Sequence, residues 1–405
     1  MRREIEVYSH HGDTPQRAGV LRPSYTGRVL AGASFEYDPD FLVGGYALSP
    51  DLPLTPGRLF TPAHSTMFGA LADAAPDEWG RKIIAASSNA NPPRALNEFD
   101  YLLAVSDATR MGALRLRSSD GRWLSDDPGV ANIHDLPRIL DAAHRYDQHR
   151  ASDEDLAYLN DIATSPGGAR PKANVRLPSG SLAIAKLPHS KDGTIDVERW
   201  EAVALTLAAS AGIRVPRFTV HNDRDRKAVL LVERFDRTAG QRIPYMSAFT
   251  ALGLGTHQTG AELTYVDFAD VIADISAHPR RELHEMFRRI ALTVLISNAD
   301  DHWRNHGFLR AEHGWQLSPV FDLNPTLSRT ISSRRISHSA DPGQRRLSDL
   351  IAAADAFELS GAAARTITDE IISVVATWPE VADRVGISPE EAAVMSRAFL
   401  ATRTA

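Results

Sequence analysis

Leu295 to Pro325 of this chain read LISNADDHWRNHGFLRAEHGWQLSPVFDLNP, and the other elements can be ordered around this segment. Apolar residues at helical spacing run up to Leu295, so the segment begins at the end of a helix. The loop that follows holds a group of polar residues: Asp300, Asp301, His302 and Asn305. Residues 307–309 and 315–317 then predict the two strands of a hairpin, which leads to Asp322. The order is helix, carboxylate, amide, hairpin and second carboxylate.

Phosphoryl transfer from ATP requires groups of these types. A carboxylate has to orient or deprotonate the attacking hydroxyl, while an amide oxygen and a second carboxylate hold Mg²⁺ against the phosphates. The spacing from Asp300 to Asn305 equals that of the protein-kinase catalytic loop, and Asp322 follows a short hairpin as the metal-binding Asp of a kinase does. We therefore interpret Asp300 as the catalytic base and Asn305 and Asp322 as Mg²⁺ ligands.

Two alternative roles for these residues remain open. Asp and Asn commonly cap helices and build turns, and each residue taken alone favours such a structural role. The ordered combination favours catalysis instead. His302 and His306 are four residues apart, and two His with this spacing on one helix face can chelate zinc. A zinc site is the weaker interpretation, because the sequence suggests no third ligand and the loop does not look helical.

The composition is that of a folded protein with more than one domain. Its 405 residues suffice for two or three domains, and 43% hydrophobic and 24% charged residues are ordinary values for globular proteins. A formal net charge of -6 gives the whole molecule no attraction for polyanions, so we expect contact with DNA only through a local patch or a partner.

The absence of Cys and of long apolar runs excludes further classes of protein. Without Cys the chain has no disulfide, thiolate metal site or cysteine nucleophile. The first residues lack the apolar core of a signal peptide, and no run of about 18 apolar residues occurs. We expect a cytoplasmic protein that does not contact a membrane.

Residues 1–125 are predicted to form an α/β domain. Alternating apolar residues predict strands over 4–8 and 28–37, and helical spacing over 67–86, interrupted by Pro76, predicts two helices. The charged residues of the second helix are best interpreted as a solvated face. This part of the chain holds no catalytic constellation, and the polar stretch from 128 to 160 is expected to be helix and linker.

Residues 126–238 are predicted to form a smaller lobe of the kinase type. The turn SPGGARPK at 165–172 precedes a strand, and glycines in such a turn let backbone amides approach phosphate oxygens. Its candidate phosphate contacts are Gly167, Gly168, Arg170 and Lys172. A plain hairpin turn would have the same sequence features. Only the position of the turn before the next strand favours the phosphate-binding interpretation.

That strand, residues 181–187, carries Lys186 near its end, where a kinase has its phosphate-binding lysine. A helix follows over 197–211, and Glu201 in its first turns is the natural partner of Lys186 in an ion pair that positions ATP phosphates. The competing interpretation is that Lys186 is only a solvated side chain, as a strand Lys often is. A hairpin then ends where a kinase has its adenine-binding hinge, and residues 239–405 are predicted to be mainly helical.

Five motifs in this order resemble the HipA family of serine/threonine kinase toxins. In chain order they are SPGGARPK at 165–172, AK at 185–186, VERFDR at 232–237, NADDHWRN at 298–305 and SPVFD at 318–322. Residues 35–40, 47–50 and 76–79 resemble the family's N-terminal domain, so the resemblance covers nearly the whole chain. It implies an α/β (α+β) fold: a bilobal protein-kinase-like fold with an extra N-terminal α/β domain and a mainly helical C-terminal lobe.

The resemblance also implies roles for residues at matching positions. Lys186 matches the ATP-phosphate lysine, Glu233 and Phe235 the adenine-binding hinge, and Asp300 the catalytic Asp. The remaining matches are His302 with the loop His near the nucleotide, Asn305 and Asp322 with the metal ligands, and Ser165 with the Ser that is autophosphorylated to switch the kinase off. Asp301 and Trp303 match no motif residue and receive no role.

The function that follows from the resemblance is that of an ATP- and Mg²⁺-dependent protein kinase, the toxin of a type II toxin–antitoxin pair. Its expected partner is a small helix-turn-helix antitoxin, HipB-like, through which alone the protein would meet DNA. Its expected substrate is an aminoacyl-tRNA synthetase. The alternatives are a small-molecule phosphotransferase on the same scaffold and a non-catalytic co-repressor. The second is disfavoured, because every expected catalytic position holds a competent residue.

Overall fold

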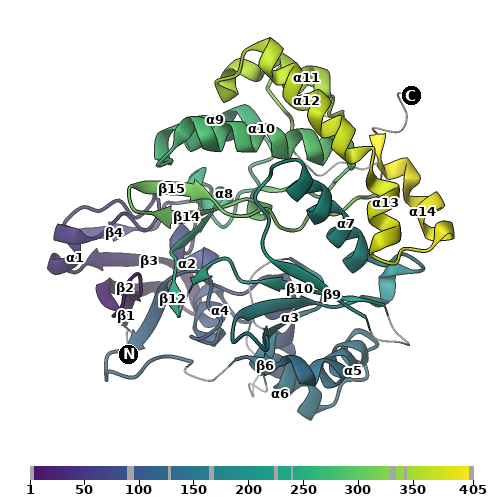
Figure 1. Ribbon diagram of the computed structural model, residues 1–405. Helices are drawn as coiled ribbons and strands as arrows, with labels where there is room; N and C mark the ends of the chain where they lie inside the picture. The colour runs from purple at the N-terminus through teal and green to yellow at the C-terminus, as the bar shows by residue number, and fades with distance from the viewer. Residues whose placement is uncertain are drawn as a thin grey trace. The chain divides into compact units, whose positions relative to one another are not determined.

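The computed structural model describes residues 4–88, 95–125, 129–163, 168–222, 227–238, 240–328, 334–341 and 344–400 (Figure 1). The chain splits into two compact units, and each is described by itself. Unit 1 comprises Met1–Ser190 and Glu233–Thr259, and unit 2 comprises Lys191–Val232 and Gly260–Ala405. The predicted elements of the sequence are distributed over both units.

Unit 1 begins with an antiparallel sheet of five strands in the order β4-β3-β2-β1-β5. The strands are β1 (Ile5–Ser9), β2 (Gln16–Thr26), β3 (Val29–Tyr37), β4 (Arg58–Phe60) and β5 (Leu114–Ser118). Strands β1 and β3 confirm the predicted strands, whereas the long β2 was not predicted. Gly19 of β2 faces Tyr37, and a Cβ there would collide with the carbonyl oxygen of Glu36, so the close pairing of β2 and β3 requires glycine.

Helices bury the core of this sheet. They are α1 (Pro39–Gly44), α2 (Gly69–Asp73) and α4 (Glu98–Ala104). Helix α3 (Glu78–Ser87) packs against α4. Pro76 separates α2 from α3 as predicted, and Asp77 caps α3 by accepting a hydrogen bond of 2.6 Å from the amide of Gly80. Phe35 and Phe68 are fully buried and contact each other edge to face, each contributing roughly 1.5–3 kcal/mol by burial.

A second layer of unit 1 carries the turn and the strand of the predicted phosphate-binding region. Its elements are β6 (Ala131–Asn132), α5 (Leu136–Asp147), α6 (Asp153–Ile162), β7 (Lys172–Arg176), β8 (Leu182–Lys186), β11 (Arg237–Thr238), β12 (Gln241–Arg242), β13 (Tyr245–Ser247) and α8 (Ala248–Ala251). Strand β7 pairs in parallel with β6 and antiparallel with β8, and in that register Lys172 lies opposite Lys186. The predicted strands around these two lysines are confirmed.

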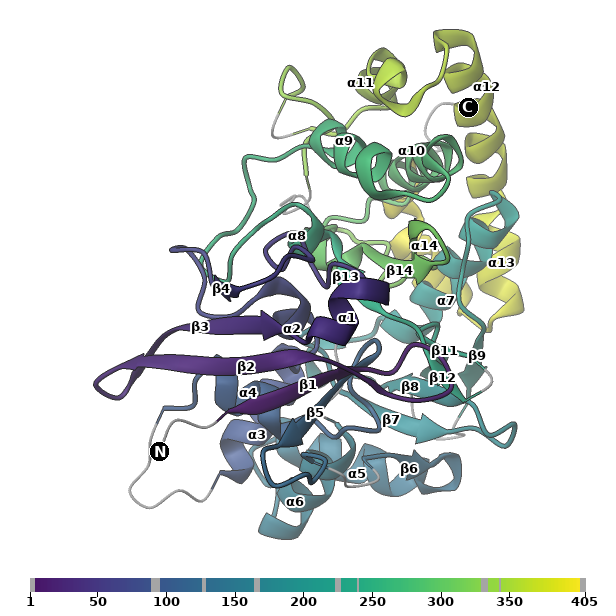
Figure 2. The ribbon, with the colours of Figure 1, turned by 90° about the vertical axis from the view of Figure 1, so that its left-hand side faces the viewer.

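Unit 2 is mainly helical and also holds two hairpins. Its helices are α7 (Val197–Ser210), α9 (Tyr265–Ile275), α10 (Pro279–Leu295), α11 (Leu347–Ala352), α12 (Gly361–Val375), α13 (Trp378–Arg384) and α14 (Pro389–Met395). The hairpins are β9 (Phe218–His221) with β10 (Val229–Glu233), and β14 (Gly307–Ala311) with β15 (Gly314–Leu317). Helix α10 lies beside α9 and α12, and both ribbon views show α9 and α10 side by side (Figure 2).

The two helices of unit 2 whose bounds the sequence predicts are confirmed: α7 spans nearly all of the predicted 197–211, and α10 ends at Leu295. The apolar face of α7 is buried through residues such as Trp200 and Leu207, and Gly212 beyond its end has a φ of 73°. Ser388 caps α14 and Pro389 occupies its first turn. Among the described residues, no helix is both long enough and apolar enough to span a membrane.

Candidate active site

The loop after α10 leaves the helix at Ser297, whose φ is 52°. The amides of Ser297 and Asn298 donate to the carbonyls of Val294 and Thr293, at 3.2 and 3.0 Å, so a left-handed residue closes the helix. Two residues after Asn298, the side chain of Asp300 is exposed. The helix end therefore presents the predicted base to solvent on a loop with defined backbone hydrogen bonds.

Asn305 is the last residue of a short 3-10 turn, η3 (Trp303–Asn305), and its side chain is buried. Its Nδ2 donates to the backbone oxygen of Asp300 at 2.9 Å, and its backbone amide donates to the carbonyl of His302 at 2.8 Å. Since Nδ2 is occupied, Oδ1 is the atom left to face a ligand. An amide oxygen fixed in this way is a suitable ligand for Mg²⁺.

Asp322 follows the β14–β15 hairpin and has a φ of 55°, in the left-handed region. Its amide donates to Oε1 of Glu201 at 3.1 Å, and Glu201 is buried in α7. The approach to Asp322 is held by a 2.8 Å hydrogen bond from the amide of Val320 to the carbonyl of Arg214. A non-glycine residue in this conformation costs on the order of 1 kcal/mol, and such residues gather at functional sites.

Several buried polar atoms around this loop have no hydrogen-bond partner in the described ranges. They are both side-chain polar atoms of Asn298, Nδ1 of His302 and Oδ1 of Asn324. Buried polar groups are normally paired, so these atoms mark a place where water, an ion or a ligand would complete the hydrogen bonding. The amide oxygens among them are of the ligand type that Mg²⁺ takes in proteins. His302, the expected nucleotide neighbour, is half-buried.

Asp301 received no role from the sequence, yet its side chain is buried within the loop. Its Oδ2 accepts a hydrogen bond from the Tyr265 hydroxyl. Its Oδ1 lies 3.0 Å from Nε2 of His306, an ion-pair contact without the geometry of a hydrogen bond. Burial alone would raise the pKa of Asp301, but the nearby His306 and the hydroxyl of Tyr265 outweigh it and lower this pKa to about 2. Burial is the main cause that raises the pKa of Tyr265, and the nearby Asp301 raises it further.

The zinc interpretation of His302 and His306 is not supported. His306 is buried, and its ring lies 5.7 Å from the ring of Phe268. Its Nε2 is in ion-pair contact with Asp301. Within the described part of the chain, no three His, Cys, Asp or Glu side chains come close enough to hold a metal ion. His306 therefore belongs to the interior of unit 2.

In unit 1, Lys172 lies differently from what the sequence suggested. Its side chain is only 3% exposed, and its Nζ is 2.6 Å from Oδ2 of Asp77 and 3.0 Å from the carbonyl of Gly168. The amide of Trp79 also donates to that carbonyl, at 3.3 Å. The charge of Lys172 is thus neutralised inside unit 1, which corrects the expectation that it would face phosphate. Its position instead fixes the backbone of Gly168.

The other predicted residues of the turn and strand are placed as follows. Lys186 ends β8 on the half-exposed face of the strand, while Ala183 and Ala185 on the opposite face are buried. Arg170 is half-buried, and Gly168 is exposed with a φ of 91°. Gly167 and Ser165 lie outside the described residues. Since Lys186 and Glu201 belong to different units, their ion pair stays a prediction.

The VERFDR motif alternates between two faces, which separates its structural residues from its candidate hinge residues. Arg234 and Asp236 are buried, and Arg234 donates to Asp236 through Nε at 2.7 Å and to the carbonyl of Thr109 at 2.8 Å. Glu233 and Phe235, on the alternate positions, are half-buried. The buried pair therefore holds the backbone, while the expected adenine contacts Glu233 and Phe235 keep part of their surface exposed.

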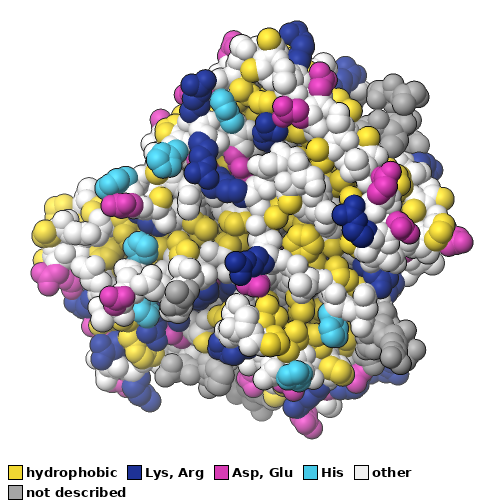
Figure 3. Space-filling model, in the orientation of Figure 1, with side chains coloured by type: hydrophobic (Ala, Val, Ile, Leu, Met, Phe, Trp, Pro, Cys, Tyr) yellow, Lys and Arg dark blue, Asp and Glu magenta, His cyan; other side chains and the backbone are white. Residues whose placement is uncertain are grey.

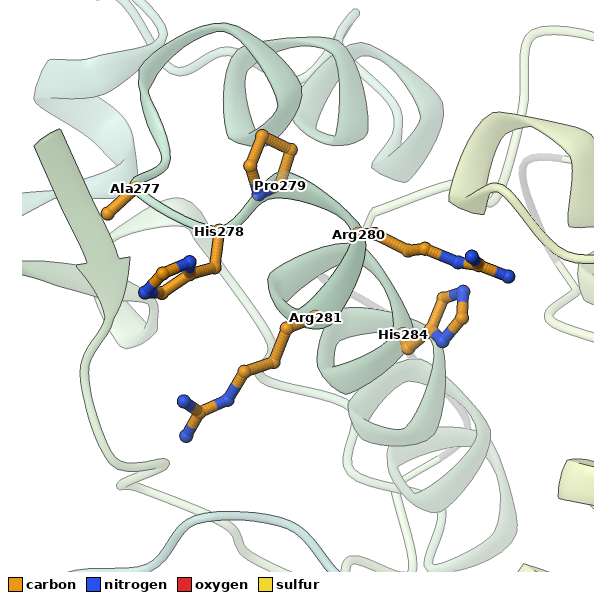
Figure 4. A pocket seen from close by; sticks show the side chains of 6 residues that line it. All are labelled: Ala277, His278, Pro279, Arg280, Arg281 and His284. Carbon is orange, nitrogen blue, oxygen red and sulfur yellow. The ribbon is translucent and has the colours of Figure 1, made fainter.

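Unit 2 also has an open hollow at the start of α10, with a volume of about 550 Å³ (Figure 4). It is lined by Ala277, His278, Pro279, Arg280, Arg281 and His284. Lys, Arg and His side chains gather over α9 and α10 on the face drawn in Figure 3. These lining residues include none of the predicted site residues, so the hollow is not part of the candidate active site.

Comparison with known families identifies this arrangement. Residues 164–378 match the HipA-like C-terminal domain, and residues 14–117 match the HipA N-terminal domain. The chain belongs to the HipA family. The predicted resemblance is thereby confirmed.

Two solved structures and one curated relative show how far the similarity to other proteins extends. HipA of Shewanella oneidensis MR-1, solved with HipB and operator DNA, matches over 97% of this chain and 94% of that chain, with a TM-score of 0.66 and 17% identity. The Helicobacter pylori proinflammatory kinase CtkA matches over 58% of this chain and 92% of that chain, with a TM-score of 0.38 and 17% identity.

The curated relative is named "Putative kinase Y4mE", from Sinorhizobium fredii, and is 26% identical over 286 residues. The alignment covers 64% of this chain and 64% of that relative, so the chain spans somewhat less than two thirds of its length. The fold of this HipA family member is the predicted α/β, kinase-like fold with an added N-terminal α/β domain and a mainly helical C-terminal part.

Proposed function

We propose that this HipA family protein is an ATP- and Mg²⁺-dependent serine/threonine protein kinase and the toxin of a type II toxin–antitoxin pair. The observation that carries the proposal is the loop of unit 2. There Asp300 is exposed, Asn305 is bonded to the Asp300 carbonyl at 2.9 Å, and Asp322 has a left-handed backbone whose amide is held by Glu201. A turn or capping role would not require this combination.

Each of these residues has a distinct task in the proposed reaction. Asp300 accepts the proton of the attacking serine or threonine hydroxyl, and its exposure leaves room for a protein substrate. Asn305 Oδ1 and the carboxylate of Asp322 hold Mg²⁺, which when bound neutralises charge on the phosphates. Glu201 supports Asp322 through its amide and, in the proposal, also holds Lys186 against the phosphates of ATP.

The partners follow from the relatives. The similar structure from Shewanella oneidensis contains HipA with HipB and operator DNA, which supports a HipB-like helix-turn-helix antitoxin as the partner of this chain. Contact with DNA would then be made only through the antitoxin. The proposed substrate is an aminoacyl-tRNA synthetase, as the resemblance to the family implies, and the name of the Sinorhizobium fredii relative supports kinase activity.

Replacing Lys186 with Met tests this function. Lys186→Met is expected to abolish transfer of labelled phosphate from ATP to proteins of a cell extract, because the phosphates lose their cationic partner. Lys82→Met is the matched control: Lys82 is 52% exposed and pairs with Glu78 one turn away, so this variant should keep wild-type activity. If Glu201 pairs with Lys186, Glu201→Gln lowers activity, and combining it with Lys186→Met causes no further loss.

Wild-type protein that binds no ATP by titration calorimetry in the presence of Mg²⁺ would contradict the proposed function. So would a Lys186→Met variant as active as the Lys82→Met control. If the losses of activity from Lys186→Met and Glu201→Gln were additive, Glu201 would not pair with Lys186. Its role would then be only to hold the amide of Asp322.

Ser165 is proposed as the autophosphorylation site that switches the kinase off. A phosphate adds about −1.5 to −2 charges at neutral pH, which would repel the phosphates of ATP from the turn that holds Ser165. Mass spectrometry of protein made in cells is expected to find this phosphate in the wild type and none in Asp300→Ala. A wild-type preparation that phosphorylates a target while Ser165 stays unmodified after long incubation would leave Ser165 a simple turn residue.

A further inference from the structure

Asp301 is a buried carboxylate that the proposed reaction does not use, although it directly follows the proposed base. Its side chain and that of His306 are each only 4% exposed, whereas Asp300 is exposed. The two aspartates are adjacent in the chain but differ completely in exposure. Burial of Asp301 therefore coincides with presentation of Asp300 to solvent.

The partners of Asp301 come from both sides of the loop. The Tyr265 hydroxyl at the start of α9 donates to Oδ2, and Nε2 of His306 lies 3.0 Å from Oδ1. His306 directly follows the proposed metal ligand Asn305. The carboxylate of Asp301, which follows the proposed base, thus contacts His306, which follows the proposed metal ligand. Only four residues separate the two in the chain.

The helix that supplies Tyr265 is itself firmly attached. The amide of Tyr265 donates to the carbonyl of Arg335 at 3.0 Å, and Thr264 caps α9 in a capping box with Asp267. Trp303, between the two ends of the loop, donates from Nε1 to the carbonyl of Gly260 at 3.0 Å. The cluster of Asp301, His306 and Tyr265 therefore ties the loop to a helix that also has hydrogen bonds outside the loop, to Arg335.

The cluster is costly, which argues against a purely packing role. Burying a carboxylate is unfavourable even when it is paired, and apolar side chains of similar volume are often neutral or stabilising replacements. Phe268 and Trp303 already surround His306 with rings 5.7 and 6.4 Å away, so an apolar continuation of this core would be available at the same place. What apolar residues cannot supply is the hydrogen bond from Tyr265 together with the ion-pair contact to His306.

We propose that Asp301, His306 and Tyr265 are positioning residues that fix the catalytic loop at both ends, holding Asp300 toward the substrate and Asn305 toward the metal. This inference rests on the proposed function for its catalytic consequence. Its structural part, a loop held rigid by one buried carboxylate, does not depend on that function. The two parts can therefore fail separately.

Hydrogen–deuterium exchange of the metal-free protein tests the structural part. In Asp301→Asn and in Tyr265→Phe, amides of the peptide spanning residues 298–308 should exchange faster than in the wild type, because the loop opens locally when its anchor is lost. Peptides from β2 in unit 1 and from α12 in unit 2 should exchange as before. Glu312→Gln is the matched control, since Glu312 forms a carboxylate–histidine pair with His313 in which both side chains are about 90% exposed.

Steady-state kinetics tests the catalytic part. Loss of residues that orient metal ligands typically costs about 10- to 100-fold in affinity or activity, so kcat should fall by that factor in Asp301→Asn. The Mg²⁺ concentration for half-maximal activity should rise about tenfold, because Asn305 is also released. A variant that merely contains less folded protein would lose activity with an unchanged Mg²⁺ requirement. Tyr265→Phe, which removes a single hydroxyl, should show the same changes to a smaller extent.

Three results would overturn the inference. The first is exchange of residues 298–308 at the wild-type rate in both Asp301→Asn and Tyr265→Phe. The second is an equal rise of exchange in α12, and the third is a fall of kcat with an unchanged Mg²⁺ requirement; either of these would mean that Asp301 only stabilises unit 2. A wild-type protein with no phosphoryl transfer at all would contradict the proposed function, while the exchange of residues 298–308 would still decide whether the cluster fixes the loop.

Discussion

Asp300→Ala is expected to lose phosphoryl transfer while keeping Mg-ATP binding. A general base contributes about 10²- to 10⁴-fold to a rate, so the variant should fall to the lower limit of a single-turnover assay with labelled ATP. Asp300 is exposed, and the residue bonded to it, Asn305, uses the backbone oxygen and not the carboxylate. Removing the side chain should therefore leave the hydrogen bond that positions Asn305 in place.

Asp322→Ala is the comparison that separates the two roles. Asp322 is proposed to hold Mg²⁺ directly, so this variant should weaken Mg-ATP binding in titration calorimetry as well as transfer. The backbone amide of Asp322 can still donate to Glu201 after the substitution, which keeps the support of α7.

Asp300→Ala with transfer within a few fold of the wild type would show that this carboxylate is not the base. Loss of nucleotide binding in Asp300→Ala would instead make it a metal ligand.

The sequence predicted elements well where local patterns are strong. The sequence predicted the hairpin of β14 and β15, the helix α7 and the end of α10 at Leu295. These features depend on periodicity and turn residues, which act over a few residues. The family was reached in the same way, because five short motifs in a fixed order are specific even when each alone is not.

Residues with long-range partners escaped prediction for a physical reason. Lys172 looked like a phosphate contact because it follows glycines, but its partner Asp77 is 95 residues away in the sequence. Asp301 looked dispensable beside Asp300, and its partner Tyr265 lies on a helix 36 residues earlier. No local pattern encodes such contacts. In the sequence two aspartates stand side by side, so residue type does not distinguish the buried Asp301 from the exposed Asp300.

The buried carboxylate of Asp236 accounts for the largest stability effect that we expect. It is fully buried and accepts hydrogen bonds of 2.6 Å from Arg234, 2.7 Å from Arg237 and 2.7 Å from the amide of Gly112. Replacing it with Asn keeps the shape but leaves two guanidinium groups without their anion. Removing one partner of a buried ion pair costs about 3–5 kcal/mol, and here the upper part of that range applies because two cations lose it.

The pH dependence gives Asp236→Asn a distinctive signature. Burial would raise the pKa of Asp236, but Arg234 and Arg237 outweigh it and hold the pKa well below its ordinary value. Because the folded-state pKa is lowered, the stabilisation is complete above the ordinary Asp pKa of about 3.9 and is lost as the pH falls toward the folded value. Urea-unfolding curves at a series of pH values should therefore show the largest gap between wild type and variant near pH 7, with a narrowing gap below about pH 4.

Asp120→Asn provides the control for this measurement. Asp120 pairs with Arg122 in unit 1, but the two side chains are 53% and 82% exposed, so water screens the pair and the unfolding midpoint should not move. A wild-type midpoint in Asp236→Asn at pH 7 would mean that Arg234 and Arg237 find other anions in unit 1. A gap that stayed constant down to about pH 3 would mean that lost packing, and not the charge of Asp236, destabilises the variant.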